Sequence, residues 1–254
     1  MFAKHLDDEA FLQKKMRGLI SLICQASEFA AMPIRDGEEA TLRQLAQYLT
    51  YPIFENQQTT KDGDLTEDHD INQPHAKTNI LLQCHFNRRP LSVDLRLDQK
   101  FILEQAVKLV HAMVDVISTS SHLNASLLAM ELSQMVVQAM WPKQSPLLQL
   151  PGFTTDLIET LKQKAQVEEI PDFMNMEDDL RERLVQVSEE QMEKLASVCN
   201  RYPIVEIKCS TDKATDRDTI GSYSAGESIN LTVTISRDDE DPDSLAVFKS
   251  PVFA

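Results

Sequence analysis

The fold is decided by residues 95–118, LRLDQKFILEQAVKLVHAMVDVIS. Apolar side chains recur in this stretch at three- and four-residue steps, in two series that lie side by side on an α-helix. The two series are Ile102, Ala106, Leu109, Met113 and Val116, and Leu103, Val107, Val110, Val114 and Ile117. Two adjacent series form a wide apolar stripe, so the stretch predicts a long central helix covered by several neighbours.

Helical patterns also precede this central stretch. Residues 12–29 carry apolar side chains at helical spacing, and Asp36 followed by Glu39 predicts a capping box that opens a second helix. The polar segment 55–72 is predicted to be an exposed, mobile loop. Pro74 then predicts the start of another helix, because proline is favoured in the first helical turn.

The segments after the central stretch complete a helical region and begin a second one. Asn124 is the predicted N-cap of a helix that Pro142 ends, so residues 1–153 are predicted to form one helical bundle. In residues 154–202, short helical pieces alternate with helix breakers, which favours a separate helix-loop-helix module. Ser188, with a glutamine three residues later, predicts a capping box in this module.

The hydrophobic period changes from 3.6 to 2 after Pro203. Residues 204–209 and 228–235 alternate apolar and polar side chains as half-buried strands do, and residues 245–248 could add a third strand. An immunoglobulin-like sandwich needs about seven strands and about 100 residues. We therefore predict that residues 203–254 form a truncated immunoglobulin-like (fibronectin III-like) β-sandwich. The fold class is mainly α with a C-terminal β part.

Composition and motifs argue against several functions. The net charge of −15 excludes binding to nucleic acid through a generally positive surface, although residues 73–153 hold seven basic and five acidic groups. No GxxxxGK[ST], GxSxG or HExxH motif occurs, and the four cysteines are scattered without a CxxC pair. We predict no enzyme activity, cofactor, metal site or small-molecule substrate, and no membrane span, because no run of 18 uncharged apolar residues is present.

Two local features are better explained by packing than by binding. Cys84 and His85 point about 100° apart on a helix, which favours a core cysteine beside a surface histidine over a metal site. Met130, Met135, Met140 and Trp141 follow one another at helical spacing, and such residues are more often core filler than a binding groove.

A polar ridge on the central helix is the candidate binding site. It consists of Arg96, Lys100, Glu104, Lys108, His111 and Asp115, which fall within about 120° of arc at 100° per residue. The basic members of this ridge, Arg96, Lys100, Lys108 and His111, are the candidate nucleic-acid-facing residues. Because Glu104 and Asp115 interrupt them, the alternative is an ordinary solvated helix face, and any RNA contact is expected to be weak.

An ordered series of segments resembles a known family. The segments are MRGLISLICQASEF (16–29), PIR (33–35), LRQLAQ (42–47), PHAKTNILLQCHFNR (74–88), AMELSQMVVQAMW (129–141), LQLPGFT (148–154), MNMED (174–178) and CNRYP (199–203). They resemble the Sec-63 homology unit, which follows the ATPase cassettes of large superfamily 2 RNA helicases. The resemblance extends to the C-terminal cassette of the spliceosomal helicases of the U5 small nuclear ribonucleoprotein.

This resemblance implies a fold and a function. It implies a bundle, a helix-loop-helix module and an immunoglobulin-like sandwich, with residues 95–118 as the ratchet helix that faces nucleic acid in active cassettes. It also implies a fragment that is a non-catalytic accessory unit in the nucleus, bracing and regulating the helicase cassette and docking spliceosomal proteins during pre-mRNA splicing. The alternative is a nucleic-acid-contacting ratchet module of a related RNA helicase or ribosome-associated remodeller. A third option, the translocation protein of the endoplasmic reticulum that gives the unit its name, is disfavoured by the absent membrane spans and J-domain.

Overall fold

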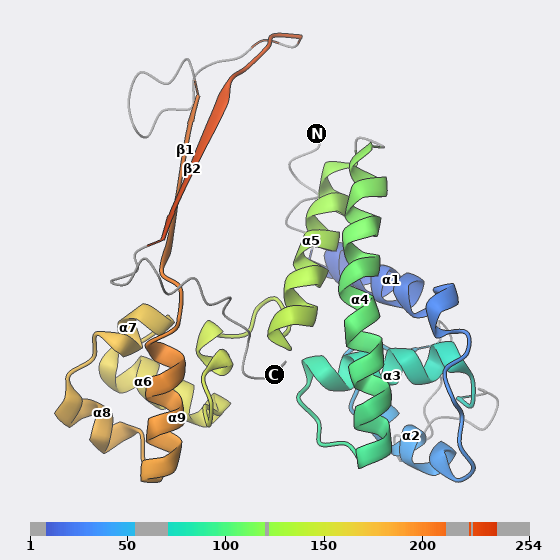
Figure 1. The fold of residues 1–254 in the computed structure, drawn as a ribbon, viewed down its shortest axis with the longest axis horizontal. Helices are drawn as coiled ribbons and strands as arrows, with labels where there is room; N and C mark the ends of the chain where they lie inside the picture. The colour runs from blue at the N-terminus through green and yellow to red at the C-terminus, as the bar shows by residue number, and fades with distance from the viewer. Residues whose placement is uncertain (1–8, 54–70, 120–121, 212–223, 225, 238–254) are drawn as a thin grey trace. The chain divides into compact units, whose positions relative to one another are not determined.

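The computed structural model describes residues 9–53, 71–119, 122–211, 224 and 226–237. Within them the chain is mainly helical with a two-stranded antiparallel sheet near its C-terminal end, which confirms the predicted fold class (Figure 1). The chain divides between residues 144 and 145 into two compact units, here called unit 1 and unit 2. None of the helices in these ranges combines the length and apolar character needed to cross a bilayer.

Unit 1 is a bundle of helices packed around α3 (Pro74–Phe86) and α4 (Val93–Thr119). Its other α-helices are α1 (Glu9–Cys24), α2 (Glu38–Ala46) and α5 (Leu123–Gln138), with a 3-10 turn at Ser27–Phe29. Helix α3 packs against each of the other four, and every residue from 76 to 86 is buried. Helix α4 runs beside α5 and also contacts α3 and α1, so it is central as predicted.

Burial is uneven along α4. Its first two thirds bury Leu95, Ile102, Leu103, Ala106 and Val110 in the unit 1 core. Its last turns are more open, and Val116, a member of the predicted apolar stripe, is 68% exposed. The stripe therefore predicted the helix correctly but overstated how far its neighbours cover it.

Two predicted helix starts in unit 1 are wrong. Helix α2 is capped by Gly37 in the left-handed conformation (φ 83°) and not by Asp36, and no side chain caps it. Glycine adopts positive φ without steric cost, so the backbone rather than a side chain makes this entry into the helix. Helix α5 begins at Leu123 after His122, which places Asn124 inside its first turn.

Unit 2 contains short helices over a core of their own. They are α6 (Thr155–Ala165), α7 (Ile170–Met174), α8 (Asp178–Leu184) and α9 (Glu189–Cys199), preceded by a 3-10 turn at Pro146–Gln149. Leu147, Phe153, Leu161, Phe173 and Leu195 are among the side chains buried in this core. The capping box at Ser188 is confirmed, because its hydroxyl accepts from the Gln191 N–H and the Gln191 side chain accepts from the Ser188 N–H.

The sheet pairs β1 (Val205–Thr211) with β2 (Leu231–Arg237) in antiparallel register, from Val205 opposite Arg237 to Thr211 opposite Leu231. Alternation places the apolar side chains of both strands on one face. The prediction of half-buried strands is wrong for the described residues, because every position except Thr211 is exposed. The sandwich remains a prediction, and residues 245–248 and most of the predicted loop 55–72 lie outside the described residues.

Candidate nucleic-acid interface

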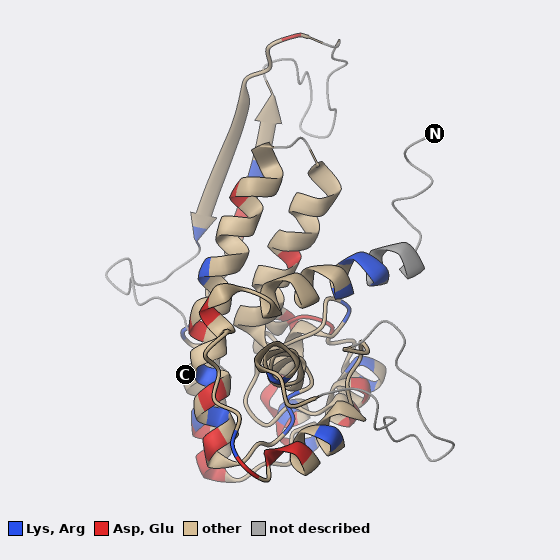
Figure 2. Ribbon diagram, turned by 90° about the vertical axis from the view of Figure 1, so that its right-hand side faces the viewer, with Lys and Arg blue, Asp and Glu red and all other residues tan. Residues whose placement is uncertain are grey.

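The structure brings the predicted ridge residues together on the outer side of α4. Arg96, Lys100, Lys108 and His111 are all exposed, and so are the two acidic residues that interrupt them. Figure 2 shows the result as basic and acidic bands that alternate along the helix. The face therefore carries cations that are open to solvent but has no continuous positive stripe. A role in binding nucleic acid stays a prediction.

A buried ionic cluster fixes the N-terminal half of α4. Lys77 on α3 is fully buried, and its Nζ lies 2.6 Å from Glu38 Oε2 and 2.8 Å from Asp98 Oδ2. The same Nζ donates to the Pro33 carbonyl at 2.7 Å. Arg35 approaches both carboxylates from the other side, with Nη1 2.6 Å from Glu38 and Nη2 3.0 Å from Asp98. Two cations and two anions thus tie α2, α3 and α4 together.

The pKa values of the two carboxyl groups show that the cluster is held ionised. Burial by itself would raise the pKa of Asp98, but hydrogen bonds from Arg35 and Lys77 outweigh it and the pKa lies below its usual range. Glu38 behaves in the same way, with the bonds from Lys77 and Arg35 overcoming the effect of burial on its pKa. Asp98 faces the interior while Arg96 and Lys100 face outward, so the cluster anchors the helix from behind the candidate interface.

Three exposed apolar side chains, which are not among the predicted site residues, lie among the cations. Val93, Leu97 and Phe101 are spaced four residues apart and are 64%, 61% and 43% exposed. Phe101 also packs edge-on against Phe29, with ring centroids 6.4 Å apart, so its ring is held in place. An exposed aromatic ring beside basic side chains is an arrangement on which single-stranded nucleic acid can stack. The four-residue spacing of these apolar side chains is the feature of the sequence that could have indicated them.

The C-terminal half of α4 is joined to α5 by a polar contact. His111 Nε2 and the Ser133 hydroxyl lie 3.2 Å apart. This contact fixes one side of the His111 ring against the neighbouring helix. His111 therefore belongs both to the ridge and to the boundary between the two helices.

His85 is a buried residue of α3, and the prediction of a surface histidine is wrong. Its side chain is only 6% exposed, and its Nε2 lies 2.8 Å from the Val136 carbonyl oxygen. Burial lowers the pKa of His85 to about 4, so the imidazole is neutral and donates to that carbonyl. Its neighbour Cys84 is buried as predicted, and burial raises the pKa of that thiol to about 11.

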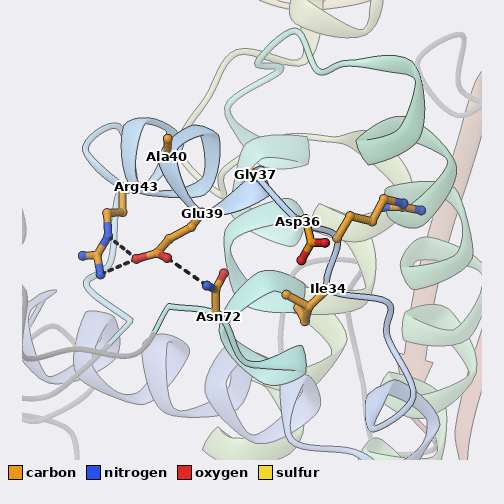
Figure 3. Close-up of a pocket in the computed structure, with 8 residues that line it drawn as sticks. Ile34, Asp36, Gly37, Glu39, Ala40, Arg43 and Asn72 are labelled. Atoms are coloured by element: carbon orange, nitrogen blue, oxygen red, sulfur yellow. Dashed lines mark hydrogen bonds and ion pairs between the residues drawn. The ribbon is translucent and has the colours of Figure 1, made fainter.

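A polar pocket of about 550 Å³ opens beside the start of α2. In Figure 3, Glu39 lies between Arg43 and Asn72, to which it is joined by an ion pair of 2.9 Å and a hydrogen bond of 2.9 Å. Arg35 and Asp36 line the same pocket. Of the two carboxylates that line the pocket, Glu39 is held by Arg43 and Asn72. Its Arg35, Glu39 and Arg43 side chains serve the packing of α2.

The fold and the ordered segments agree with a comparison against family models. Residues 2–252 match the Sec63 Brl domain, and the chain belongs to that family.

Three curated relatives are similar to most of this chain. The chain is 40% identical over 226 residues to the human U5 small nuclear ribonucleoprotein 200 kDa helicase, covering 89% of this chain and 10% of that protein. It is 39% identical over 230 residues to the DExH-box ATP-dependent RNA helicase DExH12 of Arabidopsis thaliana, with the same coverage. It is 34% identical over 247 residues to the activating signal cointegrator 1 complex subunit 3-like protein of Dictyostelium discoideum, covering 94% of this chain and 10% of that protein. The chain thus spans about a tenth of the length of these relatives.

Proposed function

We propose that this chain is a non-catalytic accessory unit of a spliceosomal RNA helicase. In this role it braces and regulates the helicase cassette and docks splicing proteins during pre-mRNA splicing, in the nucleus. One observation carries the proposal: nearly the whole chain matches the family model, and most of it matches about a tenth of the length of each of two proteins that are named as helicases, one of a small nuclear ribonucleoprotein and one of RNA.

The build of unit 1 supports a bracing role. The ionic cluster around Lys77 joins three helices, and a second set of contacts joins the end of α3 to the end of α5. In that set, Arg88 Nε donates to the Ala139 carbonyl at 3.0 Å, and Trp141 Nε1 donates to Asn87 Oδ1 at 2.7 Å. Satisfied polar contacts of this kind rigidify a core and hold its helices in one arrangement, which a bracing unit requires.

Isolation of the tagged chain from the cells that make it tests the proposal. The chain should co-purify with U5 small nuclear RNA and with an ATP-dependent RNA helicase, and depleting it should slow splicing of a reporter pre-mRNA in nuclear extract. Lys77→Met should weaken this association by loosening unit 1, whereas the matched change Lys14→Met at an exposed position of α1 should leave it intact. A chain that fractionates away from every spliceosomal particle would refute the proposal.

The exposed cations of α4 favour one second candidate, a ratchet surface that contacts nucleic acid. Lys100 and Phe101 are both exposed at successive positions of α4, about 100° apart around the helix, so a strand of RNA that crosses this face could place a phosphate near Lys100 and a base on the ring. Affinity of the chain for a single-stranded RNA should then fall steeply as salt rises, and Lys100→Glu should reduce the slope by about 1. Lys164→Glu, an equal charge change at an exposed position of α6, is the control. Equal RNA affinities of the wild type and the Lys100 variant would exclude this function.

A further inference from the structure

The outer side of α5 carries an apolar row that differs from the α4 face. Leu123, Leu127, Met130 and Val137 are 69%, 51%, 44% and 41% exposed, and Gln134 between them is also exposed. At 100° per residue these five side chains fall within about 80° of arc. We call residues 123, 127, 130, 134 and 137 the α5 seam. Met130 is therefore on the surface, and its interpretation as core filler is wrong.

The spacing along the α5 seam is that of a coiled coil. The steps are four, three, four and three residues, which is the a/d repeat of a helix that receives one partner helix. A helix that only faces a globular core shows a wider stripe. Helix α5 already has such a face on its other side, formed by the buried residues Leu128, Ala129, Leu132, Met135 and Val136. The seam is thus a second apolar face of the same helix.

Charge around the α5 seam narrows the choice of partner. Glu131 is the single ionisable side chain of α5, and Figure 2 shows this helix without the alternating bands of α4. Nucleic acid needs cations along its path, which the seam does not offer. Glu131 borders the seam on one side, and burial raises the pKa of its carboxyl group. A basic side chain on a partner would favour the ionised form of this carboxylate.

Glu131 distinguishes a different protein from a second copy of the seam. Because Glu131 is the single ionisable side chain of α5, a second α5 helix packed on the seam would bring no cation to this carboxylate, whether the two helices ran parallel or antiparallel. Covering a carboxylate without a cation or a hydrogen-bond donor is costly. A different helix can present a lysine or arginine to Glu131 and a polar residue to Gln134, as coiled coils do when one polar a position sets the register.

We propose that the α5 seam docks one amphipathic helix of a protein partner. The partner helix carries apolar side chains in a three-four repeat, a polar side chain opposite Gln134 and a lysine or arginine opposite Glu131. The seam is about 21 Å long at 1.5 Å per residue, which fits a helix of about 15 residues. This proposal holds whether or not the chain serves a helicase, since it rests only on α5.

A designed peptide tests the proposal directly. The probe is a fluorescein-labelled 21-residue helical peptide with leucines in a three-four repeat, one asparagine at the level of Gln134 and lysines beside Glu131. Its control has the same composition in a scrambled order. Fluorescence anisotropy with the full chain should show saturable binding of the probe and at least tenfold weaker binding of the scrambled peptide. Equal binding of the two peptides would overturn the proposal without any variant of the chain.

Variants of the chain locate the binding. Leu127→Glu and Met130→Glu should each weaken binding of the probe at least tenfold, while Val116→Glu, an exposed position of α4 outside the seam, should change it less than twofold. Replacing the lysines of the probe by glutamates should weaken binding at least threefold, and Glu131→Gln should remove that difference. Helical circular dichroism shows that each variant folds.

Two other outcomes would overturn the proposal. If the wild-type chain sediments as a dimer and Met130→Glu converts it to a monomer, a second copy occupies the seam. If a single-stranded RNA displaces the probe from the wild-type chain, the seam belongs to a nucleic-acid site.

Discussion

The buried imidazole of His85 makes the stability of unit 1 depend on pH in a narrow window. Its pKa is lowered to about 4 from the ordinary value of 6.5, because the charged form is desolvated. Above pH 6.5 the imidazole is neutral in both folded and unfolded chains and contributes no pH dependence. Below pH 6.5 the His85 imidazole is protonated in the unfolded chain but stays neutral in the folded chain, so the free energy of unfolding falls until the pH reaches about 4.

The magnitude follows from the pKa difference. Each pH unit within this window costs about 1.4 kcal/mol, so lowering the pH from 6.5 to 5 removes about 2 kcal/mol. That loss is a large part of the 5–15 kcal/mol typical of a folded domain. At pH 5 the carboxyl groups of Glu38 and Asp98 are still ionised, because their pKa values are lowered, so they do not add to the loss.

Urea unfolding at pH 7 and pH 5 measures the effect. Trp141 is the sole tryptophan and packs 5.0 Å from Phe86, next to His85, so its fluorescence reports on this part of unit 1. His85→Gln keeps an N–H donor for the Val136 carbonyl but does not titrate, so this variant should lose about 2 kcal/mol less than the wild type between the two pH values. His122→Gln, at an exposed histidine, should behave as the wild type does. An equal loss in the wild type and in His85→Gln would refute the reasoning.

Three further outcomes are expected. Lys77→Met should lower the free energy of unfolding by about 3 kcal/mol, because it leaves Glu38 and Asp98 buried with one cation fewer. Urea unfolding at pH 7 measures this loss, and a loss below about 1 kcal/mol would contradict the prediction. Glu38 and Asp98 should lose their contribution to the free energy of unfolding only as the pH falls below about 4, because their pKa values are lowered in the folded chain. Unfolding followed by fluorescence should show this as a second loss of stability, and no such loss is expected if the two pKa values are ordinary. Ser188→Ala should cost about 1 kcal/mol in thermal unfolding followed by circular dichroism, and an unchanged midpoint would mean that the capping box is dispensable.

The helices of this chain were largely predictable because most of them bury only one face. The stripe on α4 and the proline at the start of α3 are local signals, and each places a helix within a few residues. The capping box at Ser188 is equally local. By contrast, the entry into α2 depends on a left-handed glycine at position 37, whose backbone conformation competes with the side-chain cap that Asp36 offered.

The environment of α3 could not be read from the sequence. A helix buried on all sides has no amphipathic period, so the pattern of residues 76–86 does not show that every side of α3 is covered by other helices. Its buried polar groups are satisfied by distant partners: Gln83 exchanges hydrogen bonds with the Tyr51 backbone, and His85 bonds to Val136. Such partners become visible only when the chain has folded, and this is why His85 was placed on the surface.

Salt should weaken binding at the outer face of α4 but not at the α5 seam, and this difference separates the two kinds of binding proposed for unit 1. If Lys100 and Arg96 contact phosphates as proposed, binding would release counterions, so RNA affinity should fall as salt rises. The α5 seam is apolar except for Gln134, with Glu131 at its border, so docking of a helix there depends mainly on burial of apolar surface, which salt does not screen. Raising salt from 50 to 200 mM should therefore release RNA from the chain while a helix on the seam stays bound. If both ligands dissociate together, a single electrostatic surface binds them, and the division of unit 1 into a polar and an apolar face fails.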